Sequence, residues 1–116
     1  YAGIRIETTI GVKENNVSPY LKTTIYRIMQ EALNNVAKHS QANFVHLQLK
    51  KNKRHLNLSI RDNGRGFNLD EAMALKTSHR GFGLASMRER AEFSGAAFEI
   101  NSILGHGTTV RVVWDN

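Results

Sequence analysis

The feature that most constrains the fold of this chain is one long amphipathic segment, residues 19–39. Ser18 and Pro19 open it, and these residue types are favoured at the N-cap and at the first position of a helix. Apolar residues then recur at spacings of three and four, at Leu21, Ile25, Ile28, Met29, Ala32, Leu33 and Val36. The spacing predicts a helix over 19–39 with one apolar face, which needs a second layer to cover it.

The other patterned segments supply that layer, because most of them alternate with a period of two. Strands are predicted at 3–10, 43–51, 55–62, 96–103 and 108–114. A second helix is predicted at 84–93, a short helix at 69–75 and a polar, glycine-bearing loop at 76–83. Antiparallel hairpins outnumber crossovers in this order of elements. We therefore expect an α+β fold with a mixed, mostly antiparallel sheet and helices on one face.

Length and composition bound the kind of protein. The 116 residues suit a single domain over 1–116. The absence of cysteine excludes disulfides and cysteine-ligated zinc, and it fits a reducing compartment such as the cytoplasm. No apolar run approaches the roughly 18 residues that a membrane span needs. Because the chain begins at Tyr1 and enters a strand-like stretch at once, we expect it to be a piece of a longer protein.

The formal net charge of +6 is compatible with nucleic acid, an acidic partner or a phosphorylated ligand. Four cations cluster between two alternating segments and predict a solvated hairpin loop: Lys50, Lys51, Lys53 and Arg54. A nucleic-acid-binding module would need aromatic side chains on an open sheet face. The predicted strands offer Phe44, Phe98 and Trp114 without a paired spacing, so we expect no nucleic-acid partner.

Polar residues form a stripe along the long helix. Glu31 and Asn35 are four residues apart and share a face, and Lys38 and His39 lie one further turn along the same side. Taken alone, this is a polar flank at the margin of the core. The alternative is a site for metal and phosphate, in which the Asn35 oxygen meets Mg²⁺ and Glu31 polarises a water or a nucleophile.

The hexapeptide "DNGRGF", residues 62–67, also has two interpretations. Asn-Gly is a strong hairpin signal, which favours a tight turn. The alternative is the floor of a nucleotide pocket, because Gly64 and Gly66 allow a flat ligand to approach the backbone. The Asp62 carboxylate would then accept a hydrogen bond from an exocyclic amine, which favours adenine.

Two more glycine-bearing segments are weak signals by themselves. "GFG" at 81–83 precedes a helix, whose free N–H groups suit phosphate, and "GHGTT" at 105–109 is a plausible hairpin turn. The "GFG" segment is not a dinucleotide-binding fingerprint or a P-loop, because the third glycine and the GK[ST] sequence are missing.

The combination is far more specific. Four blocks occur in order: "QEALNNVAKHS", "DNGRGF", "GFGLASMRERAEFSG" and "GHGTTV". Together they resemble the ATP-binding catalytic domain of sensor histidine kinases, within the GHKL superfamily of gyrase, the heat-shock chaperone, histidine kinases and MutL. The variants "QEALNN…KHS" and "GLASMRERA" resemble the Nar/DesK-type subfamily most closely. The resemblance covers about residues 4–114 and implies the Bergerat fold, a two-layer α/β sandwich.

The resemblance implies a role for each matching residue. Asn35 corresponds to the asparagine that ligates Mg²⁺, and Glu31 to an acidic position that is the base in the ATP-hydrolysing relatives and a possible second metal ligand. Asn34 stands where a small hydroxyl is common, and the helical spacing from Glu31 favours Asn35 as the ligand. The implied ATP-binding residues are Asn35, Lys38, His39, Asp62, Gly64, Gly66, Gly81, Gly83, Leu84, Gly107 and Thr108.

Within this set Asp62 corresponds to the residue that binds the adenine amino group, and Lys38 and His39 to positions near the phosphates. Gly81 and Gly83 correspond to the end of the ATP lid. The lid region, about 68–82, is short, which is unlike gyrase and MutL. Gly105, Gly107 and Thr108 correspond to the last glycine box, whose threonine supports the adenine end.

The resemblance also implies a function. The chain would bind Mg-ATP and supply the γ-phosphoryl group to a histidine on its own upstream dimerisation domain, which would pass it to a response regulator. None of the five histidines has the context of that acceptor, so this chain alone would not phosphorylate itself. The parent would dimerise through the missing domain and could be membrane-anchored, and we expect no membrane contact by this domain.

Alternatives remain at this stage. A GHKL-type ATPase or an anti-sigma serine kinase would share the same pocket. A basic nucleic-acid-binding module or a non-catalytic interaction module belongs to a different class.

Overall fold

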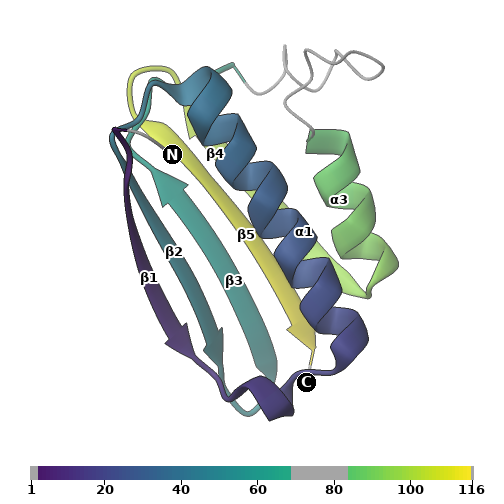
Figure 1. The fold of residues 1–116 in the computed structure, drawn as a ribbon. Coiled ribbons are helices and arrows are strands. Elements are labelled where there is room, and N and C mark those ends of the chain that lie inside the picture. The colour runs from purple at the N-terminus through teal and green to yellow at the C-terminus, as the bar shows by residue number, and fades with distance from the viewer. Residues whose placement is uncertain (1–2, 69–83, 116) are drawn as a thin grey trace.

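The computed structural model describes residues 3–68 and 84–115 (Figure 1). Its elements, in chain order, are β1 (Arg5–Gly11), the 3₁₀ turn η1 (Glu14–Asn16), α1 (Pro19–Asn35), the π-helical turn η2 (Val36–Ser40), β2 (Phe44–Lys51), β3 (His55–Asp62), α3 (Leu84–Phe93), β4 (Ala96–Ile103) and β5 (Gly107–Asp115). The five expected strands and the two longer expected helices are confirmed. The short helix expected at 69–75 and the loop at 76–83 lie outside the described residues.

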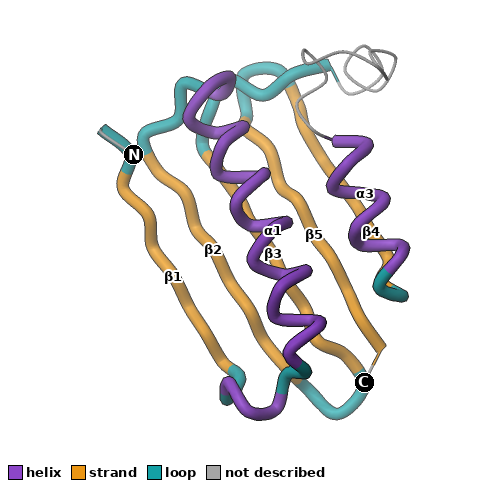
Figure 2. The backbone as a smooth tube through the Cα atoms, turned by 45° about the vertical axis from the view of Figure 1, so that its right-hand side comes forward, coloured by secondary structure: helices purple, strands orange, loops and turns teal. Residues whose placement is uncertain are grey.

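Within the described residues the sheet has five strands in the order β1-β2-β3-β5-β4. β1 and β2 are parallel, and the other neighbouring pairs are antiparallel. Both α1 and α3 lie on one face of this sheet (Figure 2). The expected two-layer α+β arrangement, with a mixed and mostly antiparallel sheet, is therefore confirmed. In the described part of the chain, no helix combines the length and the hydropathy that a membrane crossing requires.

The core lies between the helices and the sheet, and alternation along the strands builds it. Leu58 stands opposite Leu49 on one side and Val112 on the other, so their side chains point to the same face. The largest fully buried side chains come from both layers: Ile28, Leu58, Leu84, Met87, Val45 and Val112. Each contributes about 1.5–3 kcal/mol by leaving water.

The opposite face of the sheet is polar. Thr9 and His46 hydrogen-bond there across β1 and β2 at 3.3 Å. Phe44 lies on this face, whereas Phe98 packs on the helix side and Trp114 is buried in the core at 3% exposure. The three aromatic residues of the strands therefore do not form a stacking platform on the open face, which counts against the nucleic-acid-binding alternative.

The first helix differs from the expectation at its end. The sequence predicts one α-helix over 19–39, but the α-helix ends at Asn35 and continues as the π-helical turn η2. Gln41 then takes a left-handed conformation with φ of +56° and ends the helix. A π turn bonds residues five apart, which changes their angular spacing. Lys38 and His39 therefore do not simply continue the face of Glu31 and Asn35.

The other ends of the helices follow the local chemistry. The Ser18 hydroxyl accepts a hydrogen bond from the Leu21 N–H at 3.2 Å, with Pro19 at the first helical turn. Gly95 follows α3 with φ of +88°, a conformation that suits glycine at the end of a helix.

Two glycines of the β4–β5 turn form a natural pair for a stability test. Both have positive φ, +85° at Gly105 and +89° at Gly107. A Cβ on Gly105 would meet nothing within 4 Å, whereas a Cβ on Gly107 would lie 2.2 Å from the carbonyl oxygen of Asp62.

Gly105→Ala is expected to lower the free energy of unfolding by about 1–2 kcal/mol, the strain of a left-handed backbone with a side chain. Gly107→Ala is expected to cost clearly more, because the Asp62 backbone must also move. Urea denaturation followed by circular dichroism measures both losses. Equal losses would contradict the tight contact between the turn and Asp62.

Candidate functional site

A cavity lies between the helices and the sheet, where α1 and β3 end and β5 begins. Its lining comes from α1, η2, β3, the loop after β3, α3, β4 and β5. The lining residues are Ala32, Asn35, Val36, Ile60, Asp62, Gly66, Phe67, Leu84, Ile100, Thr108 and Val110. The cavity is small, about 30 Å³, and it is open to solvent. On the same measure a single water needs about 10–15 Å³.

The antiparallel pairing of β3 with β5 places the polar residues of this cavity. Asp62 is opposite Thr108 in the register, and the preceding pairs on the same face are Ile60 with Val110 and Leu58 with Val112. Because side chains alternate along a strand, Asp62 occupies the next inward-facing position after Ile60. A carboxylate therefore occupies an inward-facing position of β3 at which the alternation would place an apolar side chain.

The surroundings of Asp62 perturb its ionisation. Burial raises the pKa of this carboxyl, and hydrogen bonds from the backbone N–H groups of Gly64 and Thr108 act in the opposite direction. The Gly64 N–H donates to Oδ1 at 2.8 Å. A half-buried carboxylate beside apolar walls can accept a hydrogen bond from an N–H group of a ligand with little competition from water.

The hairpin interpretation of "DNGRGF" is wrong. β3 pairs with β2 and β5, and Asn63-Gly64 joins it to neither of them by a short turn. Instead, the Asn63 side-chain oxygen accepts hydrogen bonds from the N–H groups of Asn43 and Phe44 at 3.2 and 3.1 Å. These bonds tie the loop to the start of β2, so "DNGRGF" forms one end of the cavity.

Gly66 keeps the same loop against the turn between β4 and β5. Its φ is +65°, and a Cβ there would lie 2.2 Å from the carbonyl oxygen of Ile103. The Gly105 N–H also donates to the Arg65 carbonyl at 2.6 Å. Glycine at position 66 is thus required by close backbone packing.

Sequence reasoning did not include Phe67 and Ser102 among the site residues. The Ser102 and Thr108 hydroxyls are 2.7 Å apart, and the Phe67 N–H donates to the Ser102 hydroxyl at 2.9 Å. Phe67 also lines the cavity. Ser102 reaches Thr108 through the pairing of β4 with β5, which places the two residues opposite each other. The alternation within β4 is the one signal that could have indicated Ser102.

The structure brings some of the predicted site residues together. Those that line the cavity are Asn35, Asp62, Gly66, Leu84 and Thr108. Gly64 and Gly107 do not line it but contact Asp62, the former through its N–H and the latter through its close approach to the Asp62 carbonyl.

The remaining predicted residues are not gathered at the cavity. Glu31 is half-buried one turn before Asn35 and Lys38 is exposed on η2, and neither contributes to the lining. The side chain of His39 and all of Gly81 and Gly83 lie outside the described residues.

Asn35 brings one side-chain amide to the cavity that can serve as a metal ligand. No group of three acidic or histidine side chains suitable for a metal occurs among residues 3–68 and 84–115. Asn35 lines the cavity and Asn34 does not, in line with the helical spacing. One neutral oxygen from Asn35 fits Mg²⁺, which keeps several waters and is commonly held by the phosphates of its substrate.

Comparison with known proteins identifies the family. A model of the histidine kinase-, DNA gyrase B- and HSP90-like ATPases matches residues 21–116. The chain belongs to this family. The match begins inside α1 and covers all later elements, so it includes every residue that lines the cavity.

Curated relatives are sensor kinases. The chain is 37% identical over 101 residues to the sensor protein VraS of Staphylococcus saprophyticus, which covers 87% of this chain. It is also 37% identical over 107 residues to the sensor histidine kinase LiaS of Bacillus subtilis, which covers 92% of this chain. In both cases the chain spans 28% of the length of the relative.

Solved structures share the fold. The histidine kinase domain of a blue-light-activated kinase from Erythrobacter litoralis superposes with a TM-score of 0.79 at 18% identity, over 98% of this chain and 52% of that one. The mycobacterial sensor histidine kinase MprB gives 0.71 at 21% identity, over 98% of this chain and 83% of that one. At this identity the likeness concerns the fold.

The raised pKa of Asp62 leads to a prediction about stability without ligand. A buried carboxylate with a raised pKa destabilises the folded state above that pKa, and the penalty disappears as the pH falls and the group is protonated. Asp62→Asn keeps the oxygen that accepts from Gly64 but removes the charge. At about pH 7 the ligand-free variant is expected to melt at least as high as wild type.

The difference between the two melting temperatures should shrink as the pH is lowered into the acidic range, where the Asp62 carboxyl of wild type gains its proton. Thermal unfolding at neutral and at acidic pH measures it. A variant that melts well below wild type at neutral pH would show that the charge or the second oxygen of Asp62 stabilises the fold, which is the opposite of this account.

Proposed function

We propose that this chain is the ATP-binding catalytic domain of a sensor histidine kinase of two-component signalling. It binds Mg-ATP and delivers the γ-phosphoryl group to a histidine on a separate dimerisation domain. The observation that carries the proposal is the half-buried Asp62 carboxylate at an apolar cavity, with Asn35 and Thr108 in the same lining. Membership of the ATPase family and the likeness to VraS and LiaS support it.

The adenine ring would lie in the apolar part of the cavity. Its faces would contact side chains such as Ile60, Ile100 and Val110, and its exocyclic amine would donate to Asp62. The Ser102–Thr108 hydroxyl pair lies beside the carboxylate in the register and would support this end of the ligand. Gly64 and Gly66 shape the same wall.

The phosphates would extend from the cavity past the end of α1. Asn35 would ligate Mg²⁺, which neutralises phosphate charge during transfer. Lys38 and His39 would lie near the phosphates, and Gly81, Gly83 and Leu84 would offer backbone N–H groups at the start of α3. Glu31, one turn before Asn35, would orient the attacking group or add a metal contact.

Several parts of the proposed reaction lie in other domains or proteins. The acceptor histidine would belong to the parent's upstream dimerisation domain, through which the parent would form a dimer. A response regulator would then receive the phosphoryl group in the cytoplasm. The blocks "QEALNN" and "GLASMRERA" support assignment to the Nar/DesK-type subfamily.

Nucleotide-dependent stabilisation tests the adenine site. Mg-ATP at about 100 times its dissociation constant adds roughly 2.7 kcal/mol to the free energy of unfolding, which raises the melting temperature of a domain of this size by several degrees. Asp62→Asn should abolish most of this rise. Mg-GTP should raise the melting temperature less, because guanine presents a carbonyl where adenine presents its amine.

Asp115→Asn is the matched control, because Asp115 is an exposed carboxylate near His55, and the cavity lining does not include it. It should keep the full response to Mg-ATP. An equal response of wild type and Asp62→Asn would refute the role of Asp62, and an equal response to Mg-ATP and Mg-GTP would refute adenine selection.

The metal role of Asn35 has a separate test. In wild type, Mg²⁺ should increase the stabilisation that ATP gives, whereas in Asn35→Ala the added Mg²⁺ should have little further effect. Asn57→Ala, which changes an asparagine on the open face of the sheet, serves as the control. The same Mg²⁺ dependence in all three proteins would show that Asn35 does not bind the metal.

A further inference from the structure

The helical layer does not cover the whole inward face of the sheet. Val45 and Leu49 of β2 are buried, but their register partners on β1, Ile6 and Ile10, are 38% and 57% exposed. Figure 2 shows β1 at the edge of the sheet, away from α1 and α3. An inward-facing strip of β1 is thus left in solvent.

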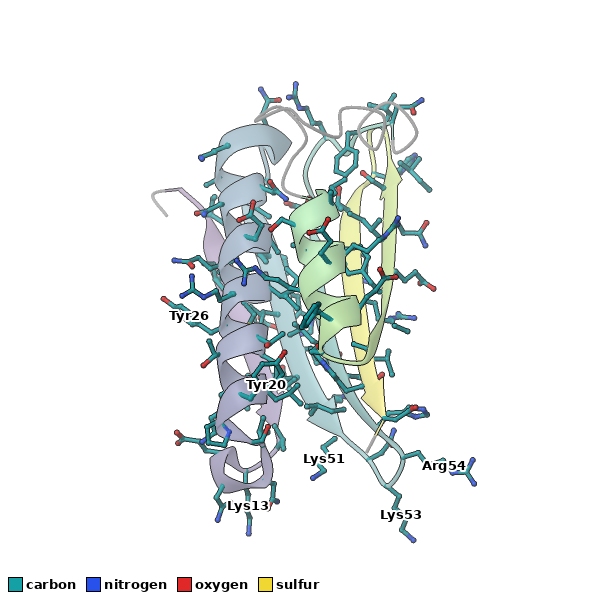
Figure 3. The ribbon with its side chains drawn as sticks, turned by 90° about the vertical axis from the view of Figure 1, so that its right-hand side faces the viewer. Lys13, Tyr20, Tyr26, Lys51, Lys53 and Arg54 are labelled. Atoms are coloured by element: carbon teal, nitrogen blue, oxygen red, sulfur yellow. The ribbon has the colours of Figure 1, made fainter. Side chains whose placement is uncertain are left out.

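The Ile10 end of this strip and the side of α1 form a groove of about 200 Å³, which we call the β1 groove. Apolar side chains make up most of its lining, among them Ile10, Val12, Tyr26, Met29 and Leu49, and the lining also includes the ion pair of Lys22 with Glu14 at 3.6 Å. Tyr26 is 59% exposed although it lies beside this apolar surface (Figure 3). A trough between a helix and an exposed strand suits the apolar face of another helix.

Cations collect at the end of the molecule where the β1 groove begins. We define this basic pole as Lys13, Lys22, Lys50, Lys51, Lys53 and Arg54. Four of these side chains are labelled at that end in Figure 3, and Lys51 Nζ donates to the Asn16 carbonyl at 3.4 Å, joining the β2–β3 hairpin to η1. Two carboxylates accompany the six cations, Glu14 and Asp115, so the pole carries +4 of the chain's net +6.

We propose that the β1 groove binds an amphipathic helix of a partner protein, with acidic residues at the end that meets the basic pole. The apolar stripe of that helix would pack on Ile10, Tyr26 and Met29. Its acidic end would lie near Lys13, which follows the groove residue Val12 directly. The negative C-terminal end of the helix dipole favours the same position.

Charge favours this occupant over others. A second copy packed groove to groove in the same direction would bring two poles of +4 together, which repel. The groove between α1 and α3 is lined largely by polar residues of both charge signs, including Arg27 and Glu89, and it offers no such complementarity.

Two synthetic helical peptides test the proposal. Both carry leucines at positions i, i+3, i+4 and i+7. One has glutamates in its last turn, and its twin has lysines there. Fluorescence anisotropy should show that the chain binds the glutamate peptide roughly tenfold more tightly than the lysine twin, and that added salt removes this difference.

The structure offers a matched pair of variants on α1. Tyr26→Glu places a charge in the β1 groove, whereas Tyr20→Glu alters an equally exposed tyrosine, 61% against 59%, in the α1–α3 groove. Tyr26→Glu should lower the affinity for the glutamate peptide roughly tenfold, while Tyr20→Glu should leave that affinity nearly unchanged. Ile10→Thr, which keeps a β-branched residue in β1, should also lower the affinity for the glutamate peptide.

A double variant, Lys13→Gln with Lys51→Gln, tests the charge of the basic pole. Arg61→Gln, which removes a cation from the open face of the sheet, is the control. The double variant should bind the glutamate peptide no better than the lysine twin. Unfolding midpoints close to wild type confirm that each variant is folded.

Several results would overturn the proposal. The first is that neither peptide binds, and the second is that both peptides bind equally well. The third is that Tyr26→Glu and Tyr20→Glu lose the same affinity for the glutamate peptide. Binding to phosphatidylglycerol vesicles that depends on the lysines but not on Tyr26 would assign the pole to a lipid surface. Self-association that Tyr26→Glu abolishes would assign the groove to a second copy.

Discussion

The pairing of β3 with β5 determines the geometry of the cavity end. It puts Asp62 opposite Thr108, directly after two apolar pairs that belong to the core. Burial there disfavours the charged carboxylate, and the N–H groups of Gly64 and Thr108 offset part of that cost. The neighbouring glycines follow from the same arrangement, because Gly107 must approach the Asp62 carbonyl closely. Natural sequences tend to place such a local conflict, a charge at a core position, where function needs it.

Much of the fold followed from periodicity, and the parts that did not have identifiable causes. Strict alternation predicted β2 and β3, and spacings of three and four predicted α1 up to its last turn. The π turn Val36–Ser40 was missed because no simple sequence pattern separates bonds five residues apart from bonds four apart. The role of Ser102 depends on the partner of β4, which local patterns do not specify.

The site shows the same division. Asp62 and Asn35 were recognised from their spacing and from the family blocks, and both line the cavity. The choice between hairpin and pocket for "DNGRGF" could not be made locally, because the Asn63 side chain selects its partners about twenty residues earlier in the chain. Lys38 and Glu31 were predicted near the same ligand, and their contribution depends on a phosphate position beyond the cavity. The proposed nucleotide and helix sites would lie towards opposite ends of α1, whose 17 residues span about 25 Å.

The most direct test of the central claim is a nuclear magnetic resonance titration of the ¹⁵N-labelled chain with Mg-ATP. The account predicts that the largest amide shifts occur at the two donors to Asp62, Gly64 and Thr108, and at residues of the cavity lining such as Phe67 and Leu84. Amides of the basic pole, such as Lys53, should stay nearly unchanged. Shifts that centre on the basic pole and leave Gly64 and Thr108 in place would contradict the assignment of the cavity as the nucleotide site.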